Sequence, residues 1–303
     1  MLKVINGRLA WSVPGERPVH IDPRRLRQLF IYDKVSLSDK VMQILFEHQV
    51  EVAWLSPGGR RCRGRLVSAR PTMSLRMLQH QALQDGSARL QLARYFVQSK
   101  LDSQLEFLRR AQRNGNSVGD TIVRIDQLVN RVASSTSLAE LRGLEGTASR
   151  LWFANFANLL VPPWSFPGRV KRPPTDPINA LLSLGYTWLT TCITAQLEGR
   201  GFEVQLGALH EYRPGRPALS CDVIEPLRVP IVDRWVLKLC NRNSVKESDF
   251  VTTTEKGTRL IPEKFRELLS LWDEHLVRSH FQSKLDQHLR ELETMFRRET
   301  MPG

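Results

Sequence analysis

The residue types best able to do chemistry lie in the stretch 201–242. His210 ends a short apolar run there, and a Pro-Gly turn follows it. Asp222 and Glu225 come next, three residues apart, so both can lie on one face at the start of a helix. A neutral imidazole with carboxylates makes a mixed nitrogen and oxygen ligand set. Such a set suits Mn²⁺ or Mg²⁺ with open positions better than a closed structural zinc site.

A further carboxylate, Glu145, lies upstream in a helix predicted over about residues 138–160. Helical spacing puts it on the face of Leu141, Ala148 and Trp152, where it interrupts an apolar stripe. A buried ionised carboxylate must be paired, neutralised or bound to a metal, because a lone buried charge is costly. From this helix alone, an ion pair with one of the many arginines explains Glu145 equally well.

Each of these residues also has a structural explanation. A single histidine at the end of an apolar run is more often a hydrogen-bonded structural residue than a ligand. Asp222 can be a helix N-cap with Glu225 as its partner in the first turn, and Pro226 suits that turn. Capping and metal binding do not exclude each other, so the spacing leaves both open.

The chain is strongly basic. Its 303 residues include 44 Lys and Arg against 31 Asp and Glu, which gives a formal charge of +13 and a pI near 10.1. This charge favours a polyanionic partner, most simply nucleic acid, although a basic protein with a solvated surface is the alternative. The polyanion is favoured by a cluster of arginines in a region of turns: Arg60, Arg61, Arg63, Arg65 and Arg70.

The composition also indicates in which cellular compartment the protein works. The four cysteines include no pair with zinc or redox spacing, so we expect reduced thiols in a cytosolic protein. The N-terminus has no signal-peptide core, and no run approaches the ~18 apolar residues of a membrane span. With 41% apolar residues the chain can build cores, so global disorder is excluded. The sequence predicts a soluble protein with no membrane partner.

Residues 1–70 are predicted to form a small β-sandwich or β-sheet domain. Asn6-Gly7 separates two strand-like runs and is the strongest short hairpin signal, because both turn positions need a positive φ. Further strands are expected at 29–32, 50–55 and 62–67, with a short helix starting at Ser38. An edge strand of this sheet could pair with a second copy, which makes this domain the candidate for dimerisation.

Beyond residue 72 the apolar pattern has helical period, and we expect a connector over 71–85 and a helical domain over 86–303. The proline-rich segment 161–177 cannot be regular structure. Asp176-Pro177 is a good N-cap and first turn for a helix over 178–197, which is apolar on most sides and should lie at the buried centre. The predicted fold class is therefore α+β, a small N-terminal β domain followed by a larger all-α-helical catalytic domain.

Three blocks of sequence occur together. The first is LHEYRPGRP at 209–217, followed by Leu219, Asp222, Glu225, Arg228 and IVDR at 231–234. The second is FPGR at 166–169 with RPPTDPINALLSLGY at 172–186, and the third is LEG at 144–146 with Ala148 and Phe156. Together they resemble the signature of the CRISPR-associated spacer-acquisition integrases and endonucleases, the universal "Cas one" family. The order of the remaining predicted elements agrees along essentially the whole chain.

The resemblance implies an N-terminal β domain, a C-terminal α-helical domain and homodimers that assemble with a small companion protein, "Cas two". It implies a metal-dependent nuclease and DNA integrase that acts in CRISPR antiviral defence in the prokaryotic cytoplasm, on double-stranded DNA of the incoming fragment and of the repeat array. Carried onto matching positions, it makes Glu145, His210 and Glu225 the catalytic metal ligands for Mg²⁺ or Mn²⁺, with Asp222 as an adjacent acidic member.

The predicted reaction inserts short DNA fragments into the repeat array, as a 3′-OH attacks a phosphodiester by transesterification. Two alternatives remain open at this point, a non-catalytic basic scaffold subunit of the same complex and a plain metal-dependent nuclease acting on branched DNA. Segments 60–70 and 169–172 are candidate backbone-tracking patches, or else solvated loops. The individual arginines predicted to contact DNA are Arg169, Arg172, Arg213, Arg216 and Arg228.

Overall fold

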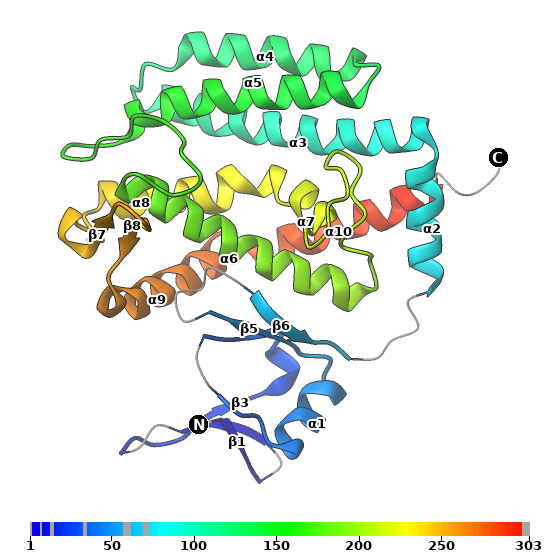
Figure 1. Cartoon of the computed structure of the whole chain (residues 1–303), viewed down its shortest axis with the longest axis vertical. Helices are drawn as coiled ribbons and strands as arrows, with labels where there is room; N and C mark the ends of the chain where they lie inside the picture. Colours follow the sequence, from blue (N-terminus) through cyan, green and yellow to red (C-terminus); the bar gives the residue numbers. More distant parts are fainter. Residues whose placement is uncertain are drawn as a thin grey trace.

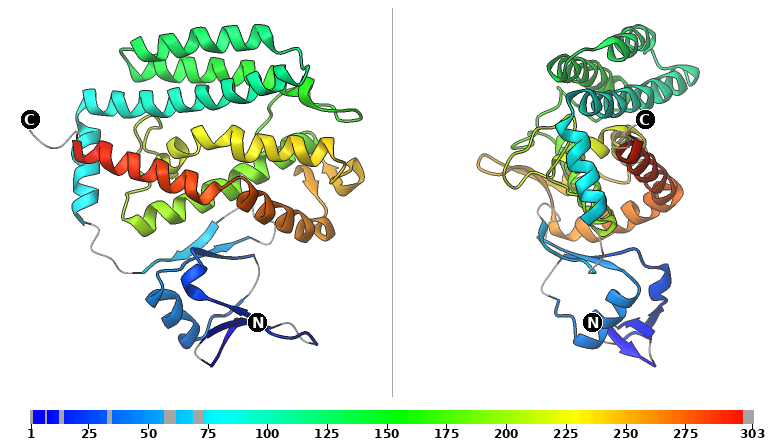
Figure 2. Two further views of the ribbon diagram at one scale, coloured as in Figure 1. Left: turned by 180° about the vertical axis from the view of Figure 1, so that it is seen from behind. Right: turned by 90° about the vertical axis from the view of Figure 1, so that its right-hand side faces the viewer.

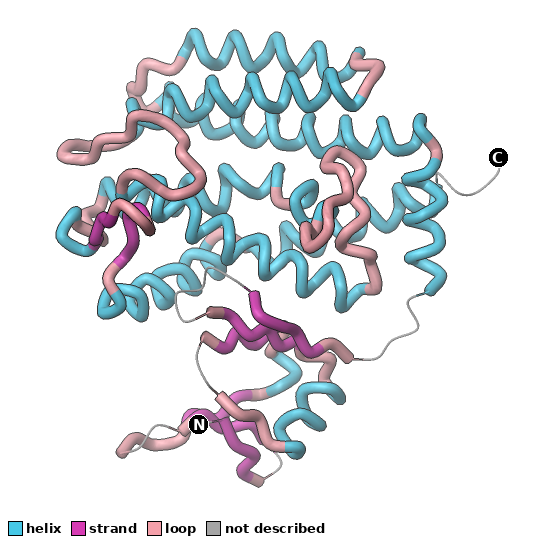
Figure 3. Tube along the Cα trace, viewed as in Figure 1, coloured by secondary structure: helices cyan, strands magenta, loops and turns pink. Residues whose placement is uncertain are grey.

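The computed structural model describes residues 2–6, 8–12, 15–32, 35–56, 62–68 and 73–298. A small part that contains most of the strands lies beneath a larger helical part (Figure 1). Figure 3, coloured by secondary structure, shows the same division, with one short hairpin of strands inside the helical part. The predicted α+β fold, with its strands at the N-terminus and its helices after them, is confirmed.

Two three-stranded sheets make up the N-terminal part. The first is antiparallel and contains β1 (Leu2–Ile5), β2 (Arg8–Trp11) and β3 (Val19–Ile21). The second contains β4 (Gln28–Ile31), β5 (Glu51–Leu55) and β6 (Cys62–Leu66). Strands β4 and β5 are parallel, because the crossover through helix α1 (Asp39–Glu47) separates them, whereas β5 and β6 are antiparallel.

The expected first hairpin is present. Strands β1 and β2 pair in register from Leu2 opposite Trp11, and Asn6 in the turn has a φ of 50°. Its neighbour Gly7 lies outside the described residues. Side chains from both sheets and from α1 form a small core of their own: Leu2, Leu9, Ile31, Val41, Leu45, Val50 and Val52.

Helices and one hairpin build the rest of the chain. The α-helices are α2 (Met73–Gln84), α3 (Gly86–Arg113), α4 (Gly119–Ser134), α5 (Leu138–Phe156), α6 (Pro177–Arg200), α7 (Ala218–Val223), α8 (Arg234–Asn241), α9 (Pro262–Arg278) and α10 (Phe281–Arg298). The hairpin consists of β7 (Phe250–Thr253) and β8 (Gly257–Leu260). Short helical turns are η1 (Pro23–Arg25), η2 (Ala157–Leu159), η3 (Glu225–Leu227), η4 (Arg228–Asp233, a π-helical turn) and η5 (Glu247–Asp249).

Local capping explains where two key helices begin. Asp176 caps α6 by accepting from the Asn179 N–H at 2.8 Å, with Pro177 in the first turn, as predicted. Ser137 caps α5 by accepting from the Glu140 N–H at 3.2 Å. Gly201 ends α6 with a φ of 92°, a left-handed conformation that favours glycine. These caps fix the ends of the helices that carry and support the site.

Helix α6 is the buried centre of the molecule, as its apolar sequence predicts. On one side its Trp188 packs against Trp235 of α8 and Trp272 of α9, with ring centroids 6.0 and 5.7 Å apart. On another side it supports the second N-terminal sheet, which lies directly beneath it in the views of Figures 1 and 2. Gln28 of β4 donates to the carbonyl of Cys192 at 2.8 Å across this contact.

The same contact continues toward the end of α6. Arg65 of β6 pairs with Glu198, with Nε 2.9 Å from the carboxylate. The carboxylate of Glu51 lies against Gly199 so closely that a Cβ at Gly199 would overlap it. A larger residue at this position would therefore displace the Glu51 carboxylate from its present place against α6.

The predicted domain boundaries stay predictions. The boundary near residue 70 falls in the segment 69–72, outside the described residues. The predicted connector, 71–85, contains helix α2, which packs against α3 and α10. None of the described helices combines the length and the apolar composition that crossing a membrane requires.

Replacing His275 with glutamine is expected to reduce the acid sensitivity of folding. Burial lowers the pKa of His275 to about 4, while its Nε2 donates to the Ile231 carbonyl at 2.8 Å. Between pH 6.5 and 4 the unfolded chain binds a proton there that the folded chain does not, so the free energy of unfolding falls as the pH falls, by at most about 1.4 kcal/mol per pH unit from this group.

Urea unfolding at several pH values between 4.5 and 7.5 measures the effect. The variant is expected to show a shallower loss of stability toward acid than the parent. His48→Gln, at an exposed position, is the matched control and should keep the parent slope. Equal slopes for parent and His275→Gln would contradict the assignment.

Candidate active site

Two of the predicted site residues meet at one ammonium group. Glu145 on α5 and Glu225 in η3 both form ion pairs with Nζ of Lys100 on α3, and the Glu225 Oε2–Nζ distance is 2.7 Å. Lys100 also donates to Ser149 Oγ at 2.9 Å, and Ser149 donates to Glu145 at 2.9 Å. The side chains of Lys100 and Glu225 are 4% and 2% exposed, whereas that of Glu145 is 25% exposed. Two carboxylates far apart in the sequence thus converge on one cation position.

Glu225 is held in its ionised form. Arg228 Nη2 lies 2.9 Å from its Oε1, opposite the contact with Lys100. Burial alone would raise the pKa of Glu225, but the charges of Arg228 and Lys100 outweigh it and lower the pKa to about 2. His210 adds to this lowering, so its imidazole lies within electrostatic range of the Glu225 carboxylate.

Asp222 organises the loop that carries His210. Its carboxylate is fully buried and accepts backbone N–H groups of Ala208, Leu209 and His210 at 2.6, 3.2 and 3.0 Å. Its Oδ1 is also 2.6 Å from His210 Nδ1. Burial raises the pKa of Asp222, and these hydrogen bonds oppose that rise. With Nδ1 donating to Asp222, the lone pair of a neutral imidazole is on Nε2 and is free for another partner.

The expectation that Asp222 caps a helix is wrong. Helix α7 begins after Pro217, and η3 follows Ile224, neither with a side-chain cap. Asp222 lies inside α7 and turns its carboxylate to the preceding loop instead. Gly207 makes room for it, because a Cβ there would come 2.7 Å from Asp222 Oδ2.

The chemistry of the donors suits a divalent cation. Within the described part of the chain no three His, Cys, Asp or Glu side chains are placed to hold a metal as they stand, and the Lys100 ammonium lies between the two acids. That ammonium nevertheless marks a position where a positive charge reaches both Glu145 and Glu225. Glu225 Oε2 has this ion pair but no well-aligned hydrogen bond among the described residues. Two carboxylates and an imidazole nitrogen suit Mg²⁺ or Mn²⁺.

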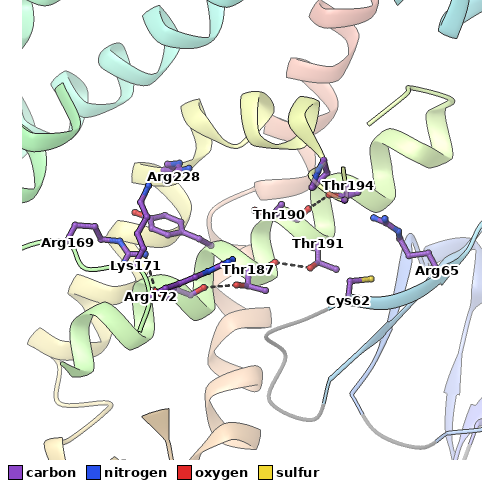
Figure 4. A pocket seen from close by; sticks show the side chains of 14 residues that line it. Cys62, Arg65, Arg169, Lys171, Arg172, Thr187, Thr190, Thr191, Thr194 and Arg228 are labelled. Carbon is purple, nitrogen blue, oxygen red and sulfur yellow. Dashed lines mark hydrogen bonds between the residues drawn. The ribbon is translucent and has the colours of Figure 1, made fainter. Parts of the chain in front are cut away.

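A basic groove of about 600 Å³ adjoins this cluster. Figure 4 shows Arg169, Lys171, Arg172 and Arg228 at one end of it and Arg65 with Cys62 at the other. Four threonines of α6 line the floor between them: Thr187, Thr190, Thr191 and Thr194. Three of these hydroxyls donate to backbone carbonyls one turn earlier, at 2.7–2.9 Å. The charged groups at the two ends must therefore supply most of the attraction for an anion.

The five predicted DNA-contacting arginines occupy different places. Arg169, Arg172 and Arg228 line the groove. Arg169 is half-buried and donates to Asn179 at 2.8 Å and Ser183 at 3.1 Å, so it also fixes the proline-rich segment onto α6.

The other two lie on the loop after His210. Arg213 is exposed there, outside the groove lining, and Arg216 is partly buried near Cys221. Of the earlier cluster, Arg63 and Arg65 lie on β6, while Arg60, Arg61 and Arg70 lie outside the described residues.

Three central residues were not predicted as site residues, although the last two lie in the quoted sequence blocks: Lys100, Tyr186 and Asp233. Tyr186 donates to Asp233 Oδ1, and both are buried. Burial raises the pKa of Asp233 to about 6. The guanidinium groups of Arg228 and Arg169 lie 4.8 and 5.5 Å from the centroid of the Tyr186 ring. Tyr186 thus holds both arginines at the edge of the groove by cation–π contact.

A signal for Lys100 was present in the sequence. Lys100 follows Phe96 by four residues and Val97 by three on a helix with a regular apolar stripe. The reasoning that singled out Glu145, a charge inside an apolar helical face, applies to it unchanged.

Comparisons with known proteins agree with one another. The family model described as CRISPR associated protein Cas1 matches residues 1–274. A CRISPR-associated endonuclease Cas1 of Rhodospirillum rubrum is 32% identical over 276 residues, which cover 86% of this chain and 77% of that protein. One of Thermus thermophilus is 33% identical over 278 residues, which cover 91% of this chain and 84% of that protein.

Solved structures share the fold. A Cas1 protein from Thermotoga maritima superposes with a TM-score of 0.81 at 20% identity, over 100% of this chain and 96% of that one. A casposase bound to integration product gives 0.77 at 22% identity, over 99% and 89%. A chain of a Cas6-RT-Cas1–Cas2 complex gives 0.77 at 24% identity, over 98% of this chain and 34% of that longer chain.

Proposed function

Since the chain belongs to the Cas1 family of CRISPR-associated proteins, we propose that it is a divalent-metal-dependent DNA integrase and endonuclease of CRISPR adaptation. In this proposal it inserts short DNA fragments into a repeat array by 3′-OH transesterification. The observation that carries the proposal is the convergence of Glu145 and Glu225 on one cation position beside His210, at the end of a basic groove. Among the relatives, two are named CRISPR-associated endonucleases and one solved neighbour is a casposase bound to integration product.

Glu145, Glu225 and His210 Nε2 are the groups that would hold Mg²⁺ or Mn²⁺. When bound, such a cation lowers the pKa of an attacking hydroxyl and stabilises the negative charge that develops at the phosphoryl group. Asp222 fixes the His210 ring through Nδ1, so we assign it an orienting role rather than a place among the ligands. Arg228 keeps Glu225 ionised and reaches the groove, where it can meet a phosphate.

DNA is the partner that the groove fits best, because basic side chains of the protein line both of its ends. Two solved neighbours are assemblies of Cas1 with Cas2 and a further one is a Cas1–DNA complex, which supports a Cas2-like companion and double-stranded DNA as partners here. We assign pairing of two copies to the N-terminal sheets, and we place the reaction in the prokaryotic cytoplasm, where the array lies.

Replacing Glu145 or His210 with alanine is expected to abolish joining while DNA binding stays near the parent level. Loss of a ligand removes several kcal/mol of transition-state stabilisation, which corresponds to a loss of about 10³-fold or more. The assay incubates a short duplex with free 3′-OH ends and a supercoiled repeat plasmid, with Mn²⁺ or Mg²⁺, with and without the companion protein. Gels measure joined product, and mobility shifts measure binding.

Glu211→Ala is the matched control for His210→Ala. It lies next to His210 on the same loop, with a 60% exposed side chain that pairs with Arg142, and should join normally. Cutting of branched DNA without joining would favour the plain nuclease, and binding without either reaction would favour the scaffold. Normal joining by Glu145→Ala or His210→Ala would show that the site is assigned wrongly.

A further inference from the structure

Lys100 occupies the position that the proposed cation needs. Its Nζ touches Glu145, Glu225 and Ser149, and the residue is 3% exposed. These are the contacts of a resident counter-ion, which neutralises two acids that would otherwise repel each other in a buried place. In the proposed function the same two carboxylates hold a divalent cation.

Both positive charges cannot occupy this position together. The ammonium lies within hydrogen-bond distance of each carboxylate, so a divalent ion bound to both would lie about 3 Å from it and be strongly repelled at low dielectric. Binding of the metal therefore requires that the Lys100 head group leave, and a lysine with four rotatable methylene bonds is able to do so. A buried ammonium must then find another acceptor.

Such an acceptor lies one helical turn away. Gln104, four residues after Lys100 on α3, is 1% exposed, and its Oε1 has no hydrogen-bond partner among the described residues. Side chains at i and i+4 of a helix are neighbours, and the later one leans back toward the earlier one. A buried carbonyl oxygen without a donor is costly to keep, so its presence one helical turn from Lys100 is informative.

We propose that Lys100 is a movable counter-ion with two positions, on the carboxylates of Glu145 and Glu225 before the metal binds and on Gln104 Oε1 after it. This inference rests on the proposed metal site. Lys100 is then a positioning residue that competes with the metal. It keeps the two acids together in the metal-free protein and sets the cation concentration at which the site fills.

The test measures Mn²⁺ affinity by titration calorimetry, and by electron paramagnetic resonance of unbound Mn²⁺, on the full chain without DNA. Lys100→Met removes the competitor and is expected to bind Mn²⁺ about tenfold tighter or more, with a lower melting temperature in the absence of metal and a larger rise on adding it. Gln104→Leu removes the acceptor and is expected to bind Mn²⁺ roughly tenfold more weakly. The double variant Lys100→Met with Gln104→Leu should have the Mn²⁺ affinity of Lys100→Met alone. Without the ammonium, Gln104 Oε1 has no donor to accept from, so its loss changes nothing.

Lys264→Met is the matched control. Lys264 also pairs with two acids, Asp249 and Glu267, on the far side of the helical part, and its loss should leave Mn²⁺ affinity unchanged. If Lys100→Met folds only when Mn²⁺ is present, the inference is supported. If Mn²⁺ does not restore its fold, or if it folds and binds Mn²⁺ no tighter than the parent, the inference is overturned.

Different results would refute the metal site and the exchange of Lys100. If Glu225→Gln leaves the Mn²⁺ affinity of the parent unchanged, the metal site itself is wrong, and with it the proposed function. If Glu225→Gln loses the Mn²⁺ but Gln104→Leu weakens binding equally with and without Lys100, the metal site stands and the exchange of Lys100 is refuted.

Discussion

Replacing Glu225 with alanine is expected to lower the free energy of unfolding by about 3–5 kcal/mol, because breaking a buried ion pair from one side leaves the other charge uncompensated. Here two positive groups lose a contact, since Lys100 and Arg228 contact different oxygens of Glu225; Lys100 keeps Glu145, whereas Arg228 loses the carboxylate that it pairs with. Glu145→Ala should cost less, about 1 kcal/mol, because that side chain borders solvent and Lys100 keeps Glu225. Urea unfolding followed by tryptophan fluorescence measures both values.

A second substitution checks the cause. Glu225→Ala combined with Arg228→Met removes the guanidinium that Glu225→Ala leaves without its carboxylate, and should regain part of the lost stability. If the double variant is less stable than Glu225→Ala by the full effect that Arg228→Met has alone, the two side chains act independently and the explanation is wrong. For assays of function the consequence is practical: an inactive Glu225→Ala protein says little about metal binding unless its folding is measured.

Replacing Asp222 with alanine is expected to reduce joining by about 10–100-fold, the usual effect of losing a group that orients a metal-binding histidine. The change removes the acceptor of three backbone N–H groups and of His210 Nδ1, so the loop loses its shape as well as the direction of the ring. Joining assays at increasing Mn²⁺ separate the causes, because a misdirected ligand is partly compensated by more metal.

Asp222→Asn provides the graded comparison. With its oxygen in the place of Oδ2, an amide of the same size still accepts from the Ala208 and Leu209 N–H groups, but its NH₂ group then faces the His210 N–H and Nδ1 and cannot accept from either. It should therefore retain more thermal stability than Asp222→Ala and still be impaired in joining. Parent-level joining by Asp222→Asn would contradict an orienting role.

Local rules explain what the sequence could predict. Asn6 fixes the first turn by its backbone preference, and Asp176 with Pro177 fixes the start of α6, since each acts within a few residues. Strand β4 pairs in parallel with β5, which lies further along the chain beyond helix α1. Strands β7 and β8 form a hairpin although their sequences are only weakly apolar. The strand patterns themselves do not encode these pairings.

In the candidate site, too, some features could be predicted from the sequence and others could not. Glu145 stood out because a charge interrupts an apolar stripe, and His210 and Glu225 stood out by residue type and by family resemblance. Their convergence on Lys100 could not be read from spacing, because it joins α3, α5 and η3 across the packed helical part. The sequence left the role of Asp222 open for a related reason. Its partners are backbone N–H groups of a preceding loop, which carry no sequence signal.

Helix α6 forms the floor of the basic groove and also supports the small β domain. Cys62 and Arg65, at one end of the groove, belong to β6 of that domain, whereas the residues at the other end belong to the helical part (Figure 4). A slight tilt of the β domain relative to α6 would therefore widen or narrow the groove in which we propose that nucleic acid binds. If two copies pair through their β domains as proposed, dimerisation and the binding of nucleic acid in the groove are mechanically coupled. Binding in one copy would then affect the groove of the other.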